Sequence, residues 1–240
     1  MLDWLHTLSL GVFQTYIWSL VQRLFVTDFF GTGETALSVC AILSCHRMTP
    51  LFQAWVKRQN KKGRNLTEIG NIDAKFFGKS DEMKLMLKGG ETNAFLEFLV
   101  RDLLHGKWQK LGEDGHLVQQ AGENLCSILD MIRQNPKRMP INLVQNFHTC
   151  AKGYLRLLPI LGVLPKPKDH MLMEMAIHLT RVGSPQLYGC WVDEGLNRLL
   201  RDVAGGAHST VHERRVLIEF PRAHDNARAR MSSSSKKRRV

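Results

Sequence analysis

Apolar residues recur every three or four positions near the start of the chain, which is the period of a helix. The first such run extends from Leu10 to Leu24. The polar residues Gln14, Gln22 and Arg23 stand between its apolar positions. We therefore expect an amphipathic helix, with these three side chains on its solvent face.

A second helix is expected over residues 35–47, where the same period continues. The pair Thr49-Pro50 follows it directly. Threonine is a good N-terminal cap, and proline is tolerated in the first turn of a helix because no backbone hydrogen bond is needed there. The sequence therefore predicts that a separate third helix begins at Pro50 and runs to about Gln59.

Helical periodicity also dominates the rest of the chain, and prolines and glycines mark the boundaries. Further helices are expected over residues 91–105, 116–134, 141–158, 168–181, 193–203 and 209–220. Neither a sustained alternation with period two nor an internal repeat is present. We therefore expect an all-α protein, an irregular multi-helix domain over residues 1–220.

Two segments interrupt this pattern. Residues 60–80 contain three glycines and little periodicity, which indicates a long basic loop or a lid. Residues 221–240 carry seven lysines and arginines against one aspartate and have no apolar period. We expect this last segment to be a disordered basic tail.

Composition narrows the class of protein. At 240 residues, with 44% hydrophobic residues, the chain can bury a substantial core. Its net charge of +11 favours a polyanionic partner such as nucleic acid. Five cysteines make a disulfide scaffold a poor fit. The most apolar stretch, residues 8–30, holds too many polar residues for a membrane span, so we expect no membrane partner.

Two basic clusters are candidate binding elements. The first comprises Lys57, Arg58, Lys61, Lys62 and Arg64. These residues are candidates for nucleic-acid binding, together with Lys166 and Lys168, although cations near a helix C-terminus are also favoured by its dipole. The second cluster, Lys236, Lys237, Arg238 and Arg239, follows a serine spacer. It fits a nuclear-import signal, a phosphate-binding arm or a solvated tail that no partner recognises.

The cysteines and histidines do not have the spacing of a metal site. Cys40, Cys45 and His46 lack the paired Cys-x-x-Cys arrangement of structural zinc. His208 and His212 lack the His-Glu-x-x-His order of a metalloprotease. We therefore expect no metal bound by these residues.

Acidic residues at the two ends of the chain have two interpretations. Asp3 stands just before the first helical run, and Asp193 and Glu194 begin a later one. All three fit ordinary first-turn or capping acids, which the helix dipole stabilises. They also belong to longer motifs: Asp3-x-x-His6 continues into Leu-Ser-Leu-Gly-Val, and Glu194 lies in Trp-x-Asp-Glu-Gly-x-Asn.

Together with Pro167-Lys-Asp-His-Met-Leu, these motifs resemble the later part of eukaryotic cut-and-paste transposases. The resemblance is to the CACTA and Kyakuja-Dileera-Zisupton groups and, more distantly, to the hAT group. It covers most of residues 1–220. It implies a ribonuclease H-like core with an Asp, Asp, Glu metal site, in which a helical insertion separates the second Asp from the Glu.

Carried over to this chain, the resemblance places Asp3 and His6 on the (Cys or Asp)-x-x-His motif. Residues 11–164 then match the insertion, and Glu194, with Asp193 as the rival, matches the final acid. On this interpretation Glu194 faces an open cleft beside Asp3 and His6. One secure acid cannot hold the two Mg²⁺ ions of strand transfer. We expect Mg²⁺ only if further sequence completes the site, and no cofactor in isolation.

The sequence as a whole predicts a transposon-derived DNA-binding protein in the nucleus, a truncated transposase without strand-transfer activity of its own. Its expected partners are DNA and either a separate catalytic half or further copies of the chain. The alternative is a non-enzymatic helical interaction protein or RNA-binding protein with a basic tail. Such a protein could equally reside in the cytoplasm.

Overall fold

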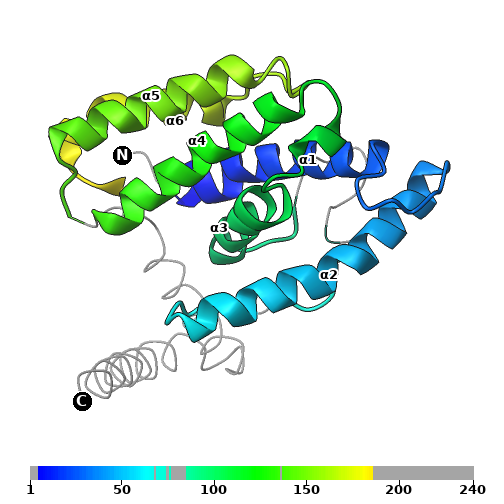
Figure 1. Ribbon diagram of the computed structural model, residues 1–240. Coiled ribbons are helices and arrows are strands. Elements are labelled where there is room, and N and C mark those ends of the chain that lie inside the picture. Colours follow the sequence, from blue (N-terminus) through cyan, green and yellow to red (C-terminus); the bar gives the residue numbers. More distant parts are fainter. Residues whose placement is uncertain (1–4, 68, 74–75, 77–84, 136, 186–240) are drawn as a thin grey trace, which may run out of the picture. The chain divides into compact units, whose positions relative to one another are not determined.

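The computed structural model describes residues 5–67, 69–73, 76, 85–135 and 137–185 (Figure 1). Over these ranges the regular structure is helical and contains no strand, which confirms the all-α class. The described residues belong to a compact unit, Met1–Tyr188. A second unit, Gly189–Val240, lies outside them, together with the helices expected over 193–203 and 209–220 and the basic tail.

The described part of the chain begins with a π-helix and contains six α-helices, a second π-helix and a 3₁₀ helix. The elements are η1 (Leu5–Val12), α1 (Phe13–Val26), α2 (Leu37–Lys61), α3 (Gly89–Phe98), the π-helix η3 (Leu99–Leu103), the 3₁₀ helix η4 (Trp108–Leu111), α4 (Gly115–Gln134), α5 (Ile141–Leu157) and α6 (Pro167–Val182). The helices expected over 91–105, 116–134, 141–158 and 168–181 are thus present, with ends displaced by a few residues at most, apart from the first, which changes to a π-helix part-way.

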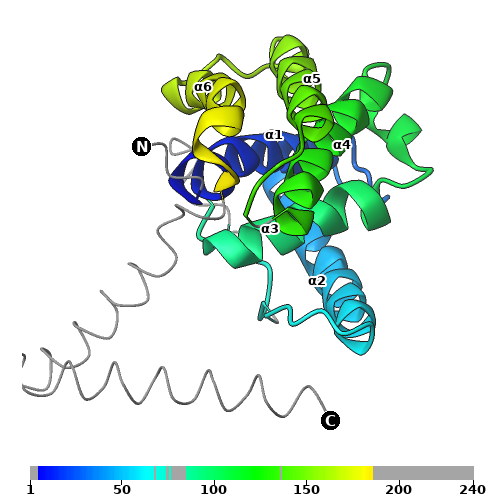
Figure 2. The same ribbon diagram turned by 90° about the vertical axis from the view of Figure 1, so that its left-hand side faces the viewer.

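Helix α1 forms the centre of the core. It packs against α2, α3 and α4, and its extension η1 packs against α3 and α6. In both views α1 runs between α2 on one side and α5 on the other (Figures 1 and 2). Phe13, Tyr16 and Leu20 are fully buried. The helix is therefore covered on most of its circumference.

This burial corrects the expectation of a solvent face on α1. Gln14 is buried, and its Nε2 donates a hydrogen bond to the carbonyl oxygen of Leu87 at 3.2 Å. Gln22 and Arg23 are partly buried, and the Arg23 guanidinium donates to the carbonyl of Ile160. Gln14 and Arg23 are tolerated in the interior because carbonyls of neighbouring connections accept their hydrogen bonds.

The separate third helix is also wrong, because α2 continues through Pro50 without a break. The hydroxyl of Thr49 does not cap a new helix. It donates to the Cys45 carbonyl at 3.0 Å and accepts a hydrogen bond from the Ile72 amide at 3.1 Å. Tertiary packing keeps the two halves of α2 in line. The ring of Phe52, just beyond Pro50, lies 5.4 Å from that of Phe95.

The connection between α2 and α3 is partly incorporated into the core. Ile72, Phe76, Leu85 and Leu87 are all buried against the hydrophobic cluster. The described part of this connection is therefore anchored to the core by apolar side chains.

Candidate nucleic-acid interface

The start of α6 is attached to η1, although the two segments are far apart in the sequence. The Lys168 ammonium group donates a hydrogen bond to the carbonyl oxygen of Leu10 at 3.0 Å. A Cβ atom on Gly11 would collide with the Lys168 side chain and would lie 2.9 Å from the His6 carbonyl oxygen. The absence of a side chain at Gly11 therefore lets Lys168 lie across η1.

The turn that places Lys168 there depends on Asp169. The Lys166 amide donates to the Asp169 Oδ2 at 2.7 Å, and Pro167 occupies the first position of α6. Lys168 consequently lies against η1 rather than being a free cation. Desolvation lowers the pKa of Lys168, and the nearby positive charge of Lys166 adds to the effect.

Asp169 and Tyr154 bring buried polar atoms to this junction. Asp169 is 2% exposed, and its Oδ1 has no hydrogen-bond partner among the described residues, nor has the Tyr154 hydroxyl. Burial raises the pKa of Asp169. Burial also raises the pKa of Tyr154, and the charge of Asp169 raises it further. The Asp169 carboxyl group is therefore easier to protonate than an exposed aspartate.

The residues of the transposase-like motifs are described only in part. His6 is exposed in the first turn of η1. Asp3, Asp193 and Glu194 lie outside the described residues, as do the four basic residues 236–239. The expected proximity of Glu194 to His6 therefore stays a prediction.

The basic cluster at the end of α2 divides into two groups. Arg58 donates two hydrogen bonds to the Asp102 carboxylate, at 2.8 and 2.9 Å. Arg64 donates to both oxygens of Glu97, at 2.6 and 3.0 Å. These two guanidinium groups join α2 and the following loop to α3 and η3.

Glu97 is a buried carboxylate with two arginine partners. It is 3% exposed, and the guanidinium of Arg133 in α4 forms a second ion pair with it. Burial by itself would raise the pKa of Glu97, but the hydrogen bonds from Arg64 and the charge of Arg133 outweigh it, so the pKa is lowered. Arg64 and Arg133 therefore hold elements of the fold together.

Lys57, Lys61 and Lys62 form the second group of this cluster. All three are exposed, and none makes an ion pair with a residue that the structure describes. Of the five cations that the sequence proposes for nucleic-acid binding in this cluster, these three are exposed to solvent and without an acidic partner among the described residues.

Sequence reasoning missed a further basic surface. Seven lysine and arginine residues and no aspartate or glutamate occur between Met131 and Lys168. Four of them, Lys137, Arg138, Lys152 and Arg156, are exposed on α5 or just before it. The signal was the absence of acids over 38 residues, which is visible without a structure.

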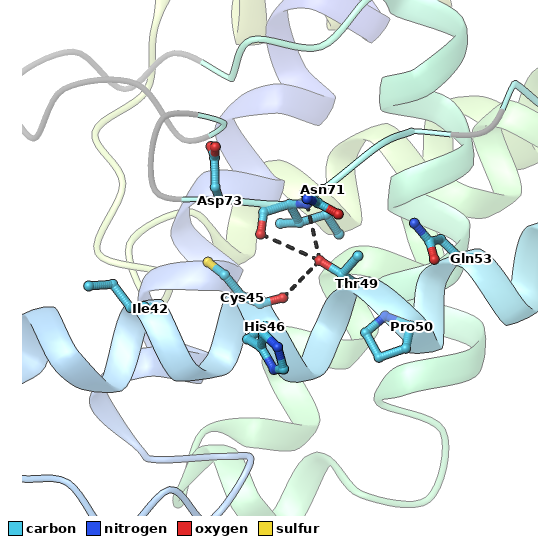
Figure 3. Close-up of a pocket in the computed structure, with 9 residues that line it drawn as sticks. Ile42, Cys45, His46, Thr49, Pro50, Gln53, Asn71 and Asp73 are labelled. Carbon is cyan, nitrogen blue, oxygen red and sulfur yellow. Dashed lines mark hydrogen bonds between the residues drawn. The ribbon is translucent and has the colours of Figure 1, made fainter.

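A pocket beside α2 contains a cysteine and a histidine among its lining residues (Figure 3). Its volume is about 690 Å³, and Cys45, Thr49, Ile72 and Asp73 are among its lining residues. Burial, followed by the negative charge of Asp73, raises the pKa of Cys45 to about 11. The thiol therefore stays protonated at neutral pH and is a poor nucleophile. His46 points away from it (Figure 3).

The described part of the chain contains no group of three or more histidine, cysteine, aspartate or glutamate side chains that could hold a metal ion. Cys40, a candidate ligand from the sequence, is buried, and its Sγ donates to the Phe25 carbonyl at 3.1 Å. Among the helices described, none is long and apolar enough to cross a membrane.

Comparisons with protein-family models, with curated proteins and with solved structures find no significant match for this chain. The transposase resemblance therefore rests on the motifs quoted above, and the interface rests on the geometry of the described residues.

Proposed function

We propose that this protein binds DNA and derives from a eukaryotic cut-and-paste transposase. One observation carries the proposal: Lys168 in Pro-Lys-Asp-His-Met-Leu donates its hydrogen bond to Leu10 in the Leu-Ser-Leu-Gly-Val run that follows His6. Two motifs that suggest the same family from the sequence thus pack together across 158 positions.

The charge of the chain supports a polyanionic partner. The net charge is +11, and the described surface presents lysines and arginines at the end of α2 and along α5 that no described acid neutralises. Cations of this kind release counterions when they neutralise phosphates, which favours binding to any DNA sequence. Binding is therefore electrostatic and tolerant of sequence.

The full chain and a fluorescein-labelled DNA duplex test this proposal by fluorescence anisotropy over a series of salt concentrations. With roughly five to eight phosphate contacts, the logarithm of the association constant should fall linearly with the logarithm of salt concentration, with a slope of about −4.5 to −7. Absence of binding at low salt, or a slope near zero, would refute DNA binding.

RNA of the same length provides the comparison with the alternative function. Tighter binding to single-stranded RNA than to duplex DNA would favour the RNA-binding interpretation. Descent from a mobile element is tested in the genome, where inverted repeats should flank the coding sequence. Their absence from every copy of the gene would count against transposon origin.

A further inference from the structure

The outward-facing side of α5 presents a continuous polar stripe. Asn142, Gln145, Thr149, Lys152 and Arg156 are all exposed. They are spaced alternately by three and four positions, so they lie on one face of the helix. At 1.5 Å per residue this stripe is about 21 Å long. We call it the outer face of α5.

The opposite side of the same helix is anchored in the core. Val144, Phe147, Ala151 and Tyr154 are buried, and α5 packs against both α4 and α6. Figures 1 and 2 both place α5 at the edge of the described unit, with one side uncovered by other described helices. The outer face is therefore a rigid surface rather than part of a loop.

The chemistry of this face is that of contacts to a nucleic-acid backbone. Cations, side-chain amides and hydroxyls supply most protein hydrogen bonds to phosphate and sugar. The Thr149 hydroxyl donates to the Gln145 carbonyl at 3.0 Å and keeps acceptor capacity. Neither Lys152 nor Arg156 forms an ion pair with a described residue. Since α5 contains no acid, a phosphate meets no negative charge along this helix.

Helix stability accounts for only one of these cations, Arg156, which lies in the last turn of α5, where the helix dipole favours positive charge. Lys137 and Arg138 precede the N-terminus of α5, where the helix dipole disfavours positive charge and no acid occupies the first turn. Lys152 and Arg156 are like charges four positions apart, which repel each other on a helix surface. The charges of Lys137 and Arg138 and the repulsion between Lys152 and Arg156 are unfavourable in the isolated protein, and a bound polyanion offsets both.

We infer that the outer face of α5, with Lys137 and Arg138, binds the sugar-phosphate backbone of duplex DNA. This inference rests on the proposed function and identifies the surface of the protein that contacts DNA. A stripe of about 21 Å spans the axial rise of about six base pairs. The C-terminal end of α2 is a weaker candidate for this surface. Lys57 and Lys61 flank the exposed Arg58–Asp102 ion pair, and the Asp102 carboxylate would repel a phosphate group.

A matched pair of double variants tests the inference in the full-length protein. Lys152→Gln with Arg156→Gln and Lys57→Gln with Lys61→Gln each remove two exposed charges four positions apart on a helix. We expect the α5 variant to reduce the magnitude of the salt slope by about two units and to weaken duplex binding at 0.1 M salt on the order of tenfold. The α2 variant should change both far less. Circular dichroism should show unchanged helix content in both.

The outcomes separate this inference from the proposed function. If the unmodified protein does not bind duplex DNA, the proposed function fails, and with it the inference. If it binds and the α5 variant keeps the same slope, the inference alone is overturned. Equal losses in both variants would show a general charge effect and would also overturn it. Tighter binding to single-stranded RNA, lost in the α5 variant, would overturn the assignment to DNA.

Discussion

Arg64 and Glu97 form a bidentate ion pair across 33 positions of sequence, with distances of 2.6 and 3.0 Å between guanidinium nitrogens and carboxylate oxygens. The carboxylate is buried in α3, whereas Arg64 comes from the loop after α2. This pair attaches the beginning of the long connection to the core, and the Arg133 guanidinium from α4 completes the arrangement. A cluster that appears from the sequence to be a binding patch thus contributes Arg64, as well as Arg58, to contacts within the fold.

Glu97→Gln should destabilise the protein by about 2–3 kcal/mol. The substitution leaves two arginines without a countercharge, and the 3–5 kcal/mol typical of breaking a buried pair is reduced here because both guanidinium groups are about one-third exposed. Urea denaturation followed by circular dichroism measures the loss. Duplex DNA binding of the folded variant should remain unchanged. A loss below about 0.5 kcal/mol would contradict the role assigned to Glu97.

Because of Asp28, the free energy of unfolding should depend on pH in the acid range. Its carboxylate accepts hydrogen bonds from the Thr32 amide at 2.7 Å, the Thr32 hydroxyl at 2.6 Å and the Gly33 amide at 2.9 Å. The bonds from Thr32 and Gly33 lower the pKa of Asp28 to about 2. An aspartate in the unfolded chain has a pKa near 3.9, so Asp28 contributes its full stability above about pH 4 and loses it as the pH falls towards 2.

Asp28→Asn separates this effect from general acid denaturation. At pH 6 the variant should unfold at a lower urea concentration than the unmodified protein, and the difference should shrink progressively between pH 4 and pH 2. A difference in urea midpoint that stays constant over this range would show that the charge of Asp28 is not involved.

Gly11→Ala should destabilise the junction between η1 and α6 by about 1–3 kcal/mol, because the added methyl group collides with Lys168 and the His6 carbonyl. Lys168→Ala removes one of the two obstacles. In a double-mutant cycle the two substitutions should therefore cost less together than the sum of their separate effects. Strict additivity of the unfolding free energies would argue against the contact.

Removal of residues 232–240 should flatten the salt dependence of DNA binding. The deletion takes away Lys236, Lys237, Arg238 and Arg239, and four phosphate contacts correspond to a change in slope of about 3.6 units. Fluorescence anisotropy with the same duplex measures it. A slope equal to that of the full chain would assign the contacts to other residues.

The same four residues should also direct nuclear import, since a short run of lysines and arginines after a serine spacer fits such a signal. A fluorescent-protein fusion of the full chain should accumulate in the nucleus, and a fusion with all four replaced by alanine should not. Nuclear accumulation of both fusions would place the signal elsewhere in the chain.

Local patterns predicted most of the helices because amphipathic periodicity is a property of neighbouring residues. In α4, α5 and α6 the apolar residues repeat every three or four positions, and these helices formed where they were expected. The prediction was wrong at Pro50, where Thr49 was expected to start a new helix. The Thr49 hydroxyl bonds instead to Cys45 and Ile72, and packing of Phe52 on α3 keeps α2 continuous.

The sequence does not show which cations of the candidate interface are free to bind a partner, because the acids that neutralise some of them lie far away along the chain. In the sequence, Arg58 and Arg64 are equivalent to Lys57 and Lys61. In the structure, Asp102 and Glu97 bind the two arginines. Those acids lie 44 and 33 positions away, and no local pattern pairs them with a particular arginine.

The helical class, most helix positions and the excess of positive charge follow from the amino-acid sequence, since each depends on composition or on residues within a few turns. Which cations remain available and which motifs meet depends on how the chain folds. Lys168 lies on Leu10 because Gly11 leaves space for it, and Gln14 is buried because the Leu87 carbonyl accepts its hydrogen bond. Burial and pairing of this kind arise from packing between distant segments, whose partners are chosen by the fold as a whole.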